Sequence, residues 1–193
     1  LDAPYPSVTL PEMIKKRGGW LMLLFVGEMF TTTAMHPFAD EISKAVVLAL
    51  FVPLIISSGG NAGSQATTLI IRALALRELR LSDWFRVLRR EVVTGAALGS
   101  ILAAIGFLRI TLWPNNRELF TDHYFLVAIC VACSLVGVVL FGSVVGSMLP
   151  FILRKLRLDP ASASAPFVAT LVDVTGLVIY FTVARIILSG TLL

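Results

Sequence analysis

The sequence predicts an all-α integral membrane protein with five transmembrane helices, and three observations support this fold class. Of the 193 residues, 57% are hydrophobic, whereas a soluble domain is roughly half apolar. The apolar residues fall in runs of about 20, which as helices cross the roughly 30 Å of bilayer hydrocarbon. The sequence has no alternating apolar and polar ten-residue segments of the kind that form transmembrane β-barrels.

The first span is expected over residues 20–35, with Trp20 as an interfacial anchor. Residues 1–19 precede it and end in a basic cluster, so we expect a cytoplasmic juxtamembrane helix there and a five-helix membrane domain over residues 20–193. The opening Leu-Asp-Ala-Pro-Tyr-Pro resembles a point inside a longer protein, which leads us to expect a further N-terminal region.

Glu28 places an acidic side chain about two turns into this first span. Charged residues inside a membrane are rare and often mark ion pathways. Two interpretations remain open for Glu28, namely a second cation site and a hydrogen-bonded or interfacial carboxyl group.

The second span is expected over residues 45–72 and contains an unusual run of small and polar residues. At helical spacing, Ser57, Gly60 and Ser64 form one small face. An adjacent polar row consists of Asn61, Gln65, Thr68 and Arg72. Such a helix either packs closely against its neighbours or borders a hydrated surface, and the amide row favours the hydrated surface. The Gly-Gly-Asn run lacks the Gly-Lys-Ser/Thr ending of a phosphate-binding loop.

The next two spans are expected over residues 92–113 and 124–149. A loop dense in charge, residues 72–91, precedes the third span, and Ser82-Asp83-Trp84 within it indicates a helix start. Pro150 is expected to mark the end of the fourth span.

The fifth span, residues 166–188, carries Asp173 near its middle. A carboxylate at that depth costs about 2.5 to 3.5 kcal/mol, so something must compensate for it. One helical stripe consists of Pro166, Ala169, Asp173, Gly176 and Tyr180. An acid on such a stripe is by default a cation or proton site, and the alternative is neutralisation by a fixed Arg or Lys on another helix.

The basic residues predict how the chain is oriented. Five spans place its two ends on opposite sides of the membrane, and twelve of the sixteen basic residues fall on the N-terminal side, within residues 15–17, 72–90 and 154–157. The positive-inside rule therefore predicts a multi-pass protein of the inner (plasma) membrane with a cytoplasmic N-terminus and an external C-terminus. Because orientation accounts for the net charge of +4, no nucleic-acid partner is expected.

No enzymatic activity is predicted. Neither His36 nor His123 stands near a nucleophile in the sequence, and no Glu-x-x-His pair occurs. Cys130 and Cys133 lie in an apolar run without a neighbouring His or carboxylate, so we expect them to be packing residues.

Two stretches resemble the transmembrane domain of the MgtE magnesium channels. These are Pro-Leu-Ile-Ile-Ser-Ser-Gly-Gly-Asn-Ala-Gly-Ser-Gln-Ala-Thr-Thr-Leu-Ile-Ile-Arg at 53–72 and Pro-Phe-Val-Ala-Thr-Leu-Val-Asp-Val-Thr-Gly-Leu at 166–177. The resemblance implies a homodimer whose pore lies on the twofold axis and is lined by the second and fifth helices of both protomers. It also implies an ion-binding role for Asp173, with Ala169 and Gly176 on its stripe and with Gly60, Asn61 and Ser64 on the second helix.

The same resemblance implies conduction of hydrated Mg²⁺ into the cytoplasm, with Mn²⁺ or another divalent ion able to take its place. Expected partners are a second copy, membrane lipid, Mg²⁺ and cytoplasmic magnesium-sensing domains of a longer chain, for which residues 1–19 would end the connecting helix. Two other functions stay open: a cation-coupled magnesium or divalent-metal exchanger, and a membrane anchor that transports nothing.

Overall fold

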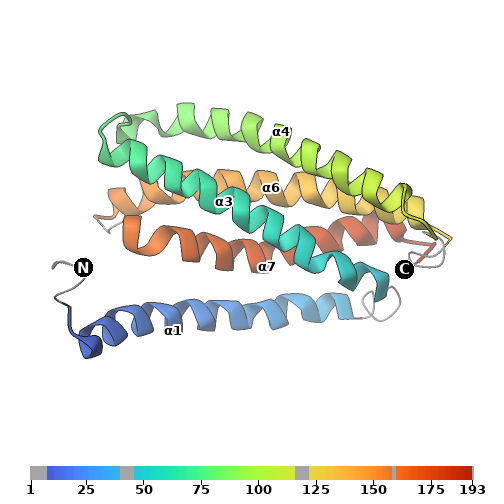
Figure 1. Ribbon diagram of the computed structural model, residues 1–193, viewed down its shortest axis with the longest axis horizontal. Helices are drawn as coiled ribbons and strands as arrows, with labels where there is room; N and C mark the ends of the chain where they lie inside the picture. Colours follow the sequence, from blue (N-terminus) through green and yellow to red (C-terminus); the bar gives the residue numbers. More distant parts are fainter. Residues whose placement is uncertain (1–7, 40–45, 116–121, 158–159, 193) are drawn as a thin grey trace.

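A computed structural model describes residues 8–39, 46–115, 122–157 and 160–192, and every regular element in these ranges is helical (Figure 1). The long helices are α1 (Leu10–Met35), α3 (Val52–Ala75), α4 (Trp84–Thr111), α6 (Tyr124–Lys155) and α7 (Pro160–Leu188). Short 3₁₀ helices are η2 (His36–Phe38), η3 (Val46–Phe51) and η4 (Leu81–Asp83). The all-α prediction is therefore confirmed for the described residues.

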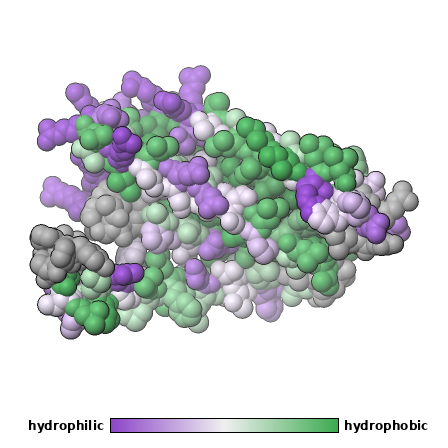
Figure 2. Space-filling model, viewed as in Figure 1, coloured by the Kyte–Doolittle hydropathy of each residue, from purple (hydrophilic) through white to green (hydrophobic). Residues whose placement is uncertain are grey.

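Successive long helices run in opposite directions, so that α1 begins at one end of the bundle and α7 ends at the other (Figure 1). Helix α6 lies at the centre and packs against α3, α4 and α7, whereas α1 lies along α7 on the outside of the bundle. Hydrophilic residues gather at the end where α4 begins and α6 ends (Figure 2). This is the arrangement that an up-and-down membrane bundle with one basic end requires.

Four segments of the described chain are long and apolar enough to cross a membrane. They are Val46–Ala75, Leu81–Thr111, Tyr124–Lys155 and Ala165–Leu188. Helix α1 has the length of a span at 26 residues but is not among them. The reason is that its apolar half carries Glu28 and three consecutive threonines, while its other half carries the basic cluster.

Helices α3 and α6 approach each other through glycines. A Cβ added at Gly142 would overlap the carbonyl oxygen of Gly59, and one added at Gly146 would overlap that of Gly63. Two small-xxx-small pairs, one on each helix, thus let the backbones touch. The expectation of close helix packing in the second span is confirmed for this face of α3.

Pro150 does not end the fourth helix, because α6 continues through it to Lys155. A proline has no N–H to donate to the carbonyl four residues earlier, which here belongs to Gly146. The Thr67 hydroxyl of α3 donates to that carbonyl oxygen instead, at 2.8 Å, and both residues are buried. A neighbouring helix therefore supplies the missing donor, and no signal in the local sequence could reveal this.

The charged loop is shorter than expected. Arg72 lies in the last turn of α3, which ends at Ala75, and the expected helix start at residues 82–84 is confirmed because η4 leads into α4 there. The Arg154 guanidinium donates to the Leu74 carbonyl oxygen at 2.9 Å, and this oxygen also accepts from the backbone N–H of Arg77 at 3.3 Å. Arg154 thus ties the end of α6 to the end of α3.

Two further helix limits differ from expectation. Helix α7 begins at Pro160, before the expected start at Pro166, which lies inside the helix. Helix α1 runs without a break from Leu10 through Trp20, so the expected juxtamembrane segment and first span share one helix.

Helix α1 and η2 attach to the bundle through α7. The Phe38 ring stacks on Phe181 with centroids 5.6 Å apart, and Arg185 donates to the Pro37 carbonyl oxygen at 3.2 Å. Halfway along α1, Gly27 lies against Thr170. Apolar side chains on the remaining sides of α1 are exposed: Leu21, Met22, Phe25, Val26, Met29 and Phe30.

Candidate ion-binding site

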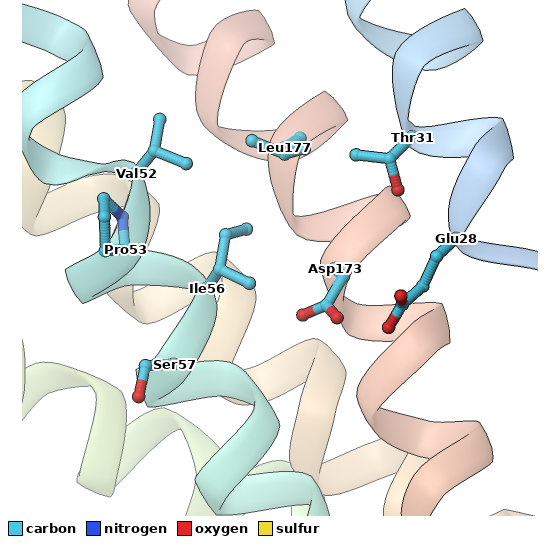
Figure 3. Close-up of a pocket in the computed structure, with 8 residues that line it drawn as sticks. All are labelled: Glu28, Thr31, Val52, Pro53, Ile56, Ser57, Asp173 and Leu177. Carbon is cyan, nitrogen blue, oxygen red and sulfur yellow. The ribbon is translucent and has the colours of Figure 1, made fainter. Parts of the chain in front are cut away.

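A pocket of about 580 Å³ lies where α1, α3 and α7 meet, and Asp173 lines it (Figure 3). The other lining residues are Glu28, Thr31, Val52, Pro53, Ile56, Ser57 and Leu177. The pocket is thus bordered by two carboxylates and two hydroxyls on a background of apolar side chains.

The packing of α7 decides where Asp173 points. Val172 is fully buried, and Gly176 is buried against Ile56 of α3 and Val138 of α6. These contacts turn one face of α7 inward and leave Asp173 half-buried at its edge. Its carboxylate extends toward the space that separates α7 from α3 (Figure 3).

Glu28 of α1 faces the same pocket. Its carboxylate lies beside that of Asp173 in Figure 3, and both residues line the pocket. None of the lining residues that the structure describes is a lysine or an arginine, and within the described ranges no basic side chain forms an ion pair with Asp173. A fixed Arg or Lys partner for Asp173 is thus not found in the described part of the chain.

The described residues contain no group of three or more His, Cys, Asp or Glu side chains that could hold a metal ion. Two carboxylates at one pocket are too few for a closed cage of protein ligands. They suit a cation that keeps most of its water, as Mg²⁺ does.

The small face of α3 continues along the helix from Ser57, the residue through which it borders the pocket. Ser57 is exposed, Gly60 and Ser64 are half-buried, and a Cβ added at Gly60 would meet no atom within 4 Å. Asn61 is exposed, and its amide donates to the Ser57 hydroxyl at 3.4 Å. This polar surface lies opposite the face of α3 that carries the tightly packed glycines. Close packing therefore accounts for one face of α3, and a hydrated surface stays a prediction for the other.

The stripe expected on α7 is divided by the fold. Ala169 and Asp173 are half-buried and accessible, whereas Gly176 and Tyr180 are buried. A Cβ at Gly176 would lie 2.8 Å from the Ile56 side chain, so this glycine lets α3 come close to α7 just beyond the acid. Of the six residues expected at the site, Asp173 alone lines the pocket itself.

Sequence reasoning missed Thr31 and Pro53 as lining residues. Each has a spacing that could have indicated it, because Thr31 follows Glu28 by three residues and Pro53 precedes Ser57 by four. Residues at these spacings share a helix face. What the sequence could not show is that the faces of α1 and α3 converge on Asp173.

The comparisons with known proteins agree with each other. Residues 52–183 match the MgtE family model, described as "Divalent cation transporter". The chain is 40% identical over 194 residues to the magnesium transporter MgtE of Thermus thermophilus, a match that covers 95% of this chain and 41% of that protein. It is 34% identical to the protein of the same name from Enterococcus faecalis and 31% identical to that from Bacillus subtilis, each over 88% of this chain and 36% of the relative. The chain thus spans about two fifths of the length of the curated relatives that it matches.

Proposed function

The chain belongs to the MgtE family of divalent cation transporters, and from this premise we propose that it forms the ion-conducting domain of a magnesium channel. In this proposal Mg²⁺ crosses the inner membrane down its electrochemical gradient into the cytoplasm. Mn²⁺ and other divalent ions of similar chemistry can occupy the same path. The observation that carries the proposal is the Asp173 carboxylate, which lies near the middle of a candidate membrane span and faces a pocket whose described lining residues include no basic side chain.

The size of the pocket supports a hydrated ion. Mg²⁺ gives up its water reluctantly, and six waters at about 30 Å³ each occupy about 180 Å³. The pocket of about 580 Å³ has room for an ion with its full first shell. Asp173 would then act through water and supply charge, while the small side chains around it leave the space.

The path of the ion is proposed to follow the small face of α3. On α3, the path would be bordered by the open space at Gly60, the amide of Asn61 and the hydroxyl of Ser64. On α7, Ala169 would form the facing wall. Gly176 would act by spacing, because it holds α3 close to α7 beside Asp173. Such a polar surface is unfavourable against lipid, so it requires a wet path or a protein partner.

A second copy is the proposed partner. A twofold axis beside α3 and α7 would bring two polar faces and two copies of Asp173 around one pore. The exposed apolar side chains of α1 would pack on the second copy or face lipid. The basic end of the bundle would lie in the cytoplasm together with the N-terminus, and the C-terminus would lie outside. Residues 1–19 would join this domain to cytoplasmic regulatory domains, and residues 20–193 would form the channel.

The test is Asp173→Asn in cells that depend on this protein for magnesium uptake. We expect uptake to be lost while the variant remains folded and assembled, because the amide keeps the shape of the side chain but removes its charge. Asp122→Asn, which changes an exposed acid outside the spans, is the matched control and is expected to transport normally. Normal uptake by the Asp173 variant would refute the proposed site.

One observation favours a second candidate function, a cation-coupled exchanger. Glu28 lies beside Asp173, and a second carboxylate could hold a proton or a sodium ion while Mg²⁺ moves. Flux into liposomes distinguishes the two functions. A channel conducts Mg²⁺ without a counter-ion gradient and shows single-channel currents, whereas an exchanger requires the gradient.

A further inference from the structure

A second pocket lies at the basic end of the bundle, in a groove bordered by the start of α4 and the end of α6. Its volume is about 360 Å³. The lining residues are Leu81, Trp84 and Leu88 on one side and Met148, Phe151 and Ile152 on the other. One charged residue, Lys155, completes the lining. Among the described lining residues, the groove is therefore apolar along its length, with one cation, Lys155, at its rim.

The groove lies at the ends of two candidate membrane spans. Leu81 is the first residue of the span Leu81–Thr111, and Lys155 is the last residue of the span Tyr124–Lys155. Both lie at the same end of the bundle because α4 and α6 run in opposite directions (Figure 1). The apolar lining thus lies in the end turns of two candidate spans, and Lys155 is at the end of one of them, where a basic side chain can reach lipid headgroups.

The floor of the groove is well ordered by packing. Phe151 is buried in a cluster with Ile70, Leu74 and Val87, and Met148 packs against that cluster. The rim is open, because Trp84 is 49% exposed and Ile152 is 53% exposed. The groove therefore has a rigid floor and an accessible opening, so a flexible apolar chain can bind in it.

The surrounding charge indicates what fills this groove. Arg89, Arg90, Arg154 and Lys155 are all exposed at this end, where Figure 2 shows hydrophilic residues gathered. Basic pockets beside membrane helices at the cytoplasmic surface recognise anionic headgroups. We propose that this groove binds an anionic glycerophospholipid, with one acyl chain against Trp84 and the phosphate at Lys155.

The groove carries its own reporter, since Trp84 lines it and the chain has two other tryptophans, Trp20 and Trp113. A variant with Trp20→Phe and Trp113→Phe leaves Trp84 as the only indole. This variant is placed in phosphatidylcholine nanodiscs that contain one brominated lipid, either brominated phosphatidylglycerol or brominated phosphatidylcholine. Bromine on the acyl chains quenches indole fluorescence at short range. We expect brominated phosphatidylglycerol to quench Trp84 more strongly at equal mole fraction.

Lys155→Gln in the same background tests the headgroup contact. Removing one basic residue near an anionic surface is expected to weaken the apparent affinity for phosphatidylglycerol about fivefold. Arg77→Gln is the matched control, since Arg77 is exposed at the same end but does not line the groove. It is expected to leave the preference unchanged.

Three outcomes would overturn the proposal. Equal quenching by both brominated lipids would mean that ordinary boundary lipid covers the groove. Absence of quenching by either lipid would mean that a second copy or another part of a longer chain fills it. Equal loss of the preference in the Lys155 and Arg77 variants would mean that only the diffuse charge of this end attracts the lipid.

Discussion

The Tyr180 hydroxyl donates a hydrogen bond of 2.8 Å to the carbonyl oxygen of Leu48, which lies 132 positions earlier in the chain. Both side chains are fully buried. Leu48 belongs to η3, which leads into α3, and Tyr180 lies about two helical turns beyond Asp173. The bond therefore fixes the entry of α3 relative to the part of α7 that carries the acid.

Tyr180→Phe is expected to lower the free energy of unfolding by about 1 kcal/mol, because it leaves the buried Leu48 carbonyl without this donor. The measurement is thermal unfolding in detergent. Tyr124→Phe is the control, since Tyr124 is half-buried and its hydroxyl forms no hydrogen bond with the described residues. Equal shifts in the two variants would show that the bond to Leu48 adds nothing.

Thr67→Val is expected to destabilise the protein by about 1 to 2 kcal/mol, because the Gly146 carbonyl then has neither Pro150 nor Thr67 as a donor. Thr67→Ser keeps the hydroxyl and should retain most of the stability. Thr68→Val is the matched control: its hydroxyl donates within its own helix, to Ser64, and is exposed. Thermal unfolding of the three variants tests this, and a Thr67 variant as stable as the Thr68 variant would contradict it.

Gly142→Ala is expected to destabilise the bundle by about 1 to 3 kcal/mol, because the new methyl group would overlap the Gly59 carbonyl and force α3 away from α6. Gly60→Ala adds the same methyl group where no atom lies within 4 Å. It should unfold at the temperature of the unmodified chain or slightly above it, because alanine favours a helix more than glycine does. Unfolding of the two variants at the same lowered temperature would mean that the loss comes from glycine replacement in general and not from the helix contact.

Glu28→Gln distinguishes the two interpretations of that residue. If Glu28 shares a cation with Asp173, removing its charge weakens the apparent affinity for Mg²⁺, and we expect about a tenfold increase in the half-saturating concentration. Flux measured against Mg²⁺ concentration in liposomes provides the comparison, with Glu78→Gln, an exposed acid between η4 and α3, as the control. An unchanged concentration dependence would identify Glu28 as an interfacial carboxyl group.

Much of the fold could be predicted because the bilayer imposes simple rules. Apolar length predicted five spans, and four of the corresponding segments are long and apolar enough to cross a membrane. Helical spacing placed Ser57, Gly60 and Ser64 on one face of α3. Asp173 could be singled out because a carboxylate in a membrane helix requires compensation. Each of these inferences requires only the sequence of one helix and the properties of the lipid bilayer around it.

What the sequence could not show are contacts with helices that lie far away in the sequence. Pro150 indicated a helix end because the sequence shows that a proline lacks an N–H. The sequence does not show that the Thr67 hydroxyl donates to the Gly146 carbonyl in its place. Gly176 and Tyr180 share the stripe of Asp173, yet they are buried because Ile56 and η3 cover that half of α7. For the same reason, Glu28 could not be paired with Asp173 from spacing alone.

The central position of α6 determines when the other helices can associate during synthesis. A ribosome completes α3 and α4 before α6 exists, so the glycines of both helices and the Thr67 hydroxyl enter the bilayer without their main partner. Individual helices insert first and associate afterwards. We therefore expect α3 and α4 to remain loosely held during biosynthesis until Tyr124–Lys155 leaves the translocon and draws them together.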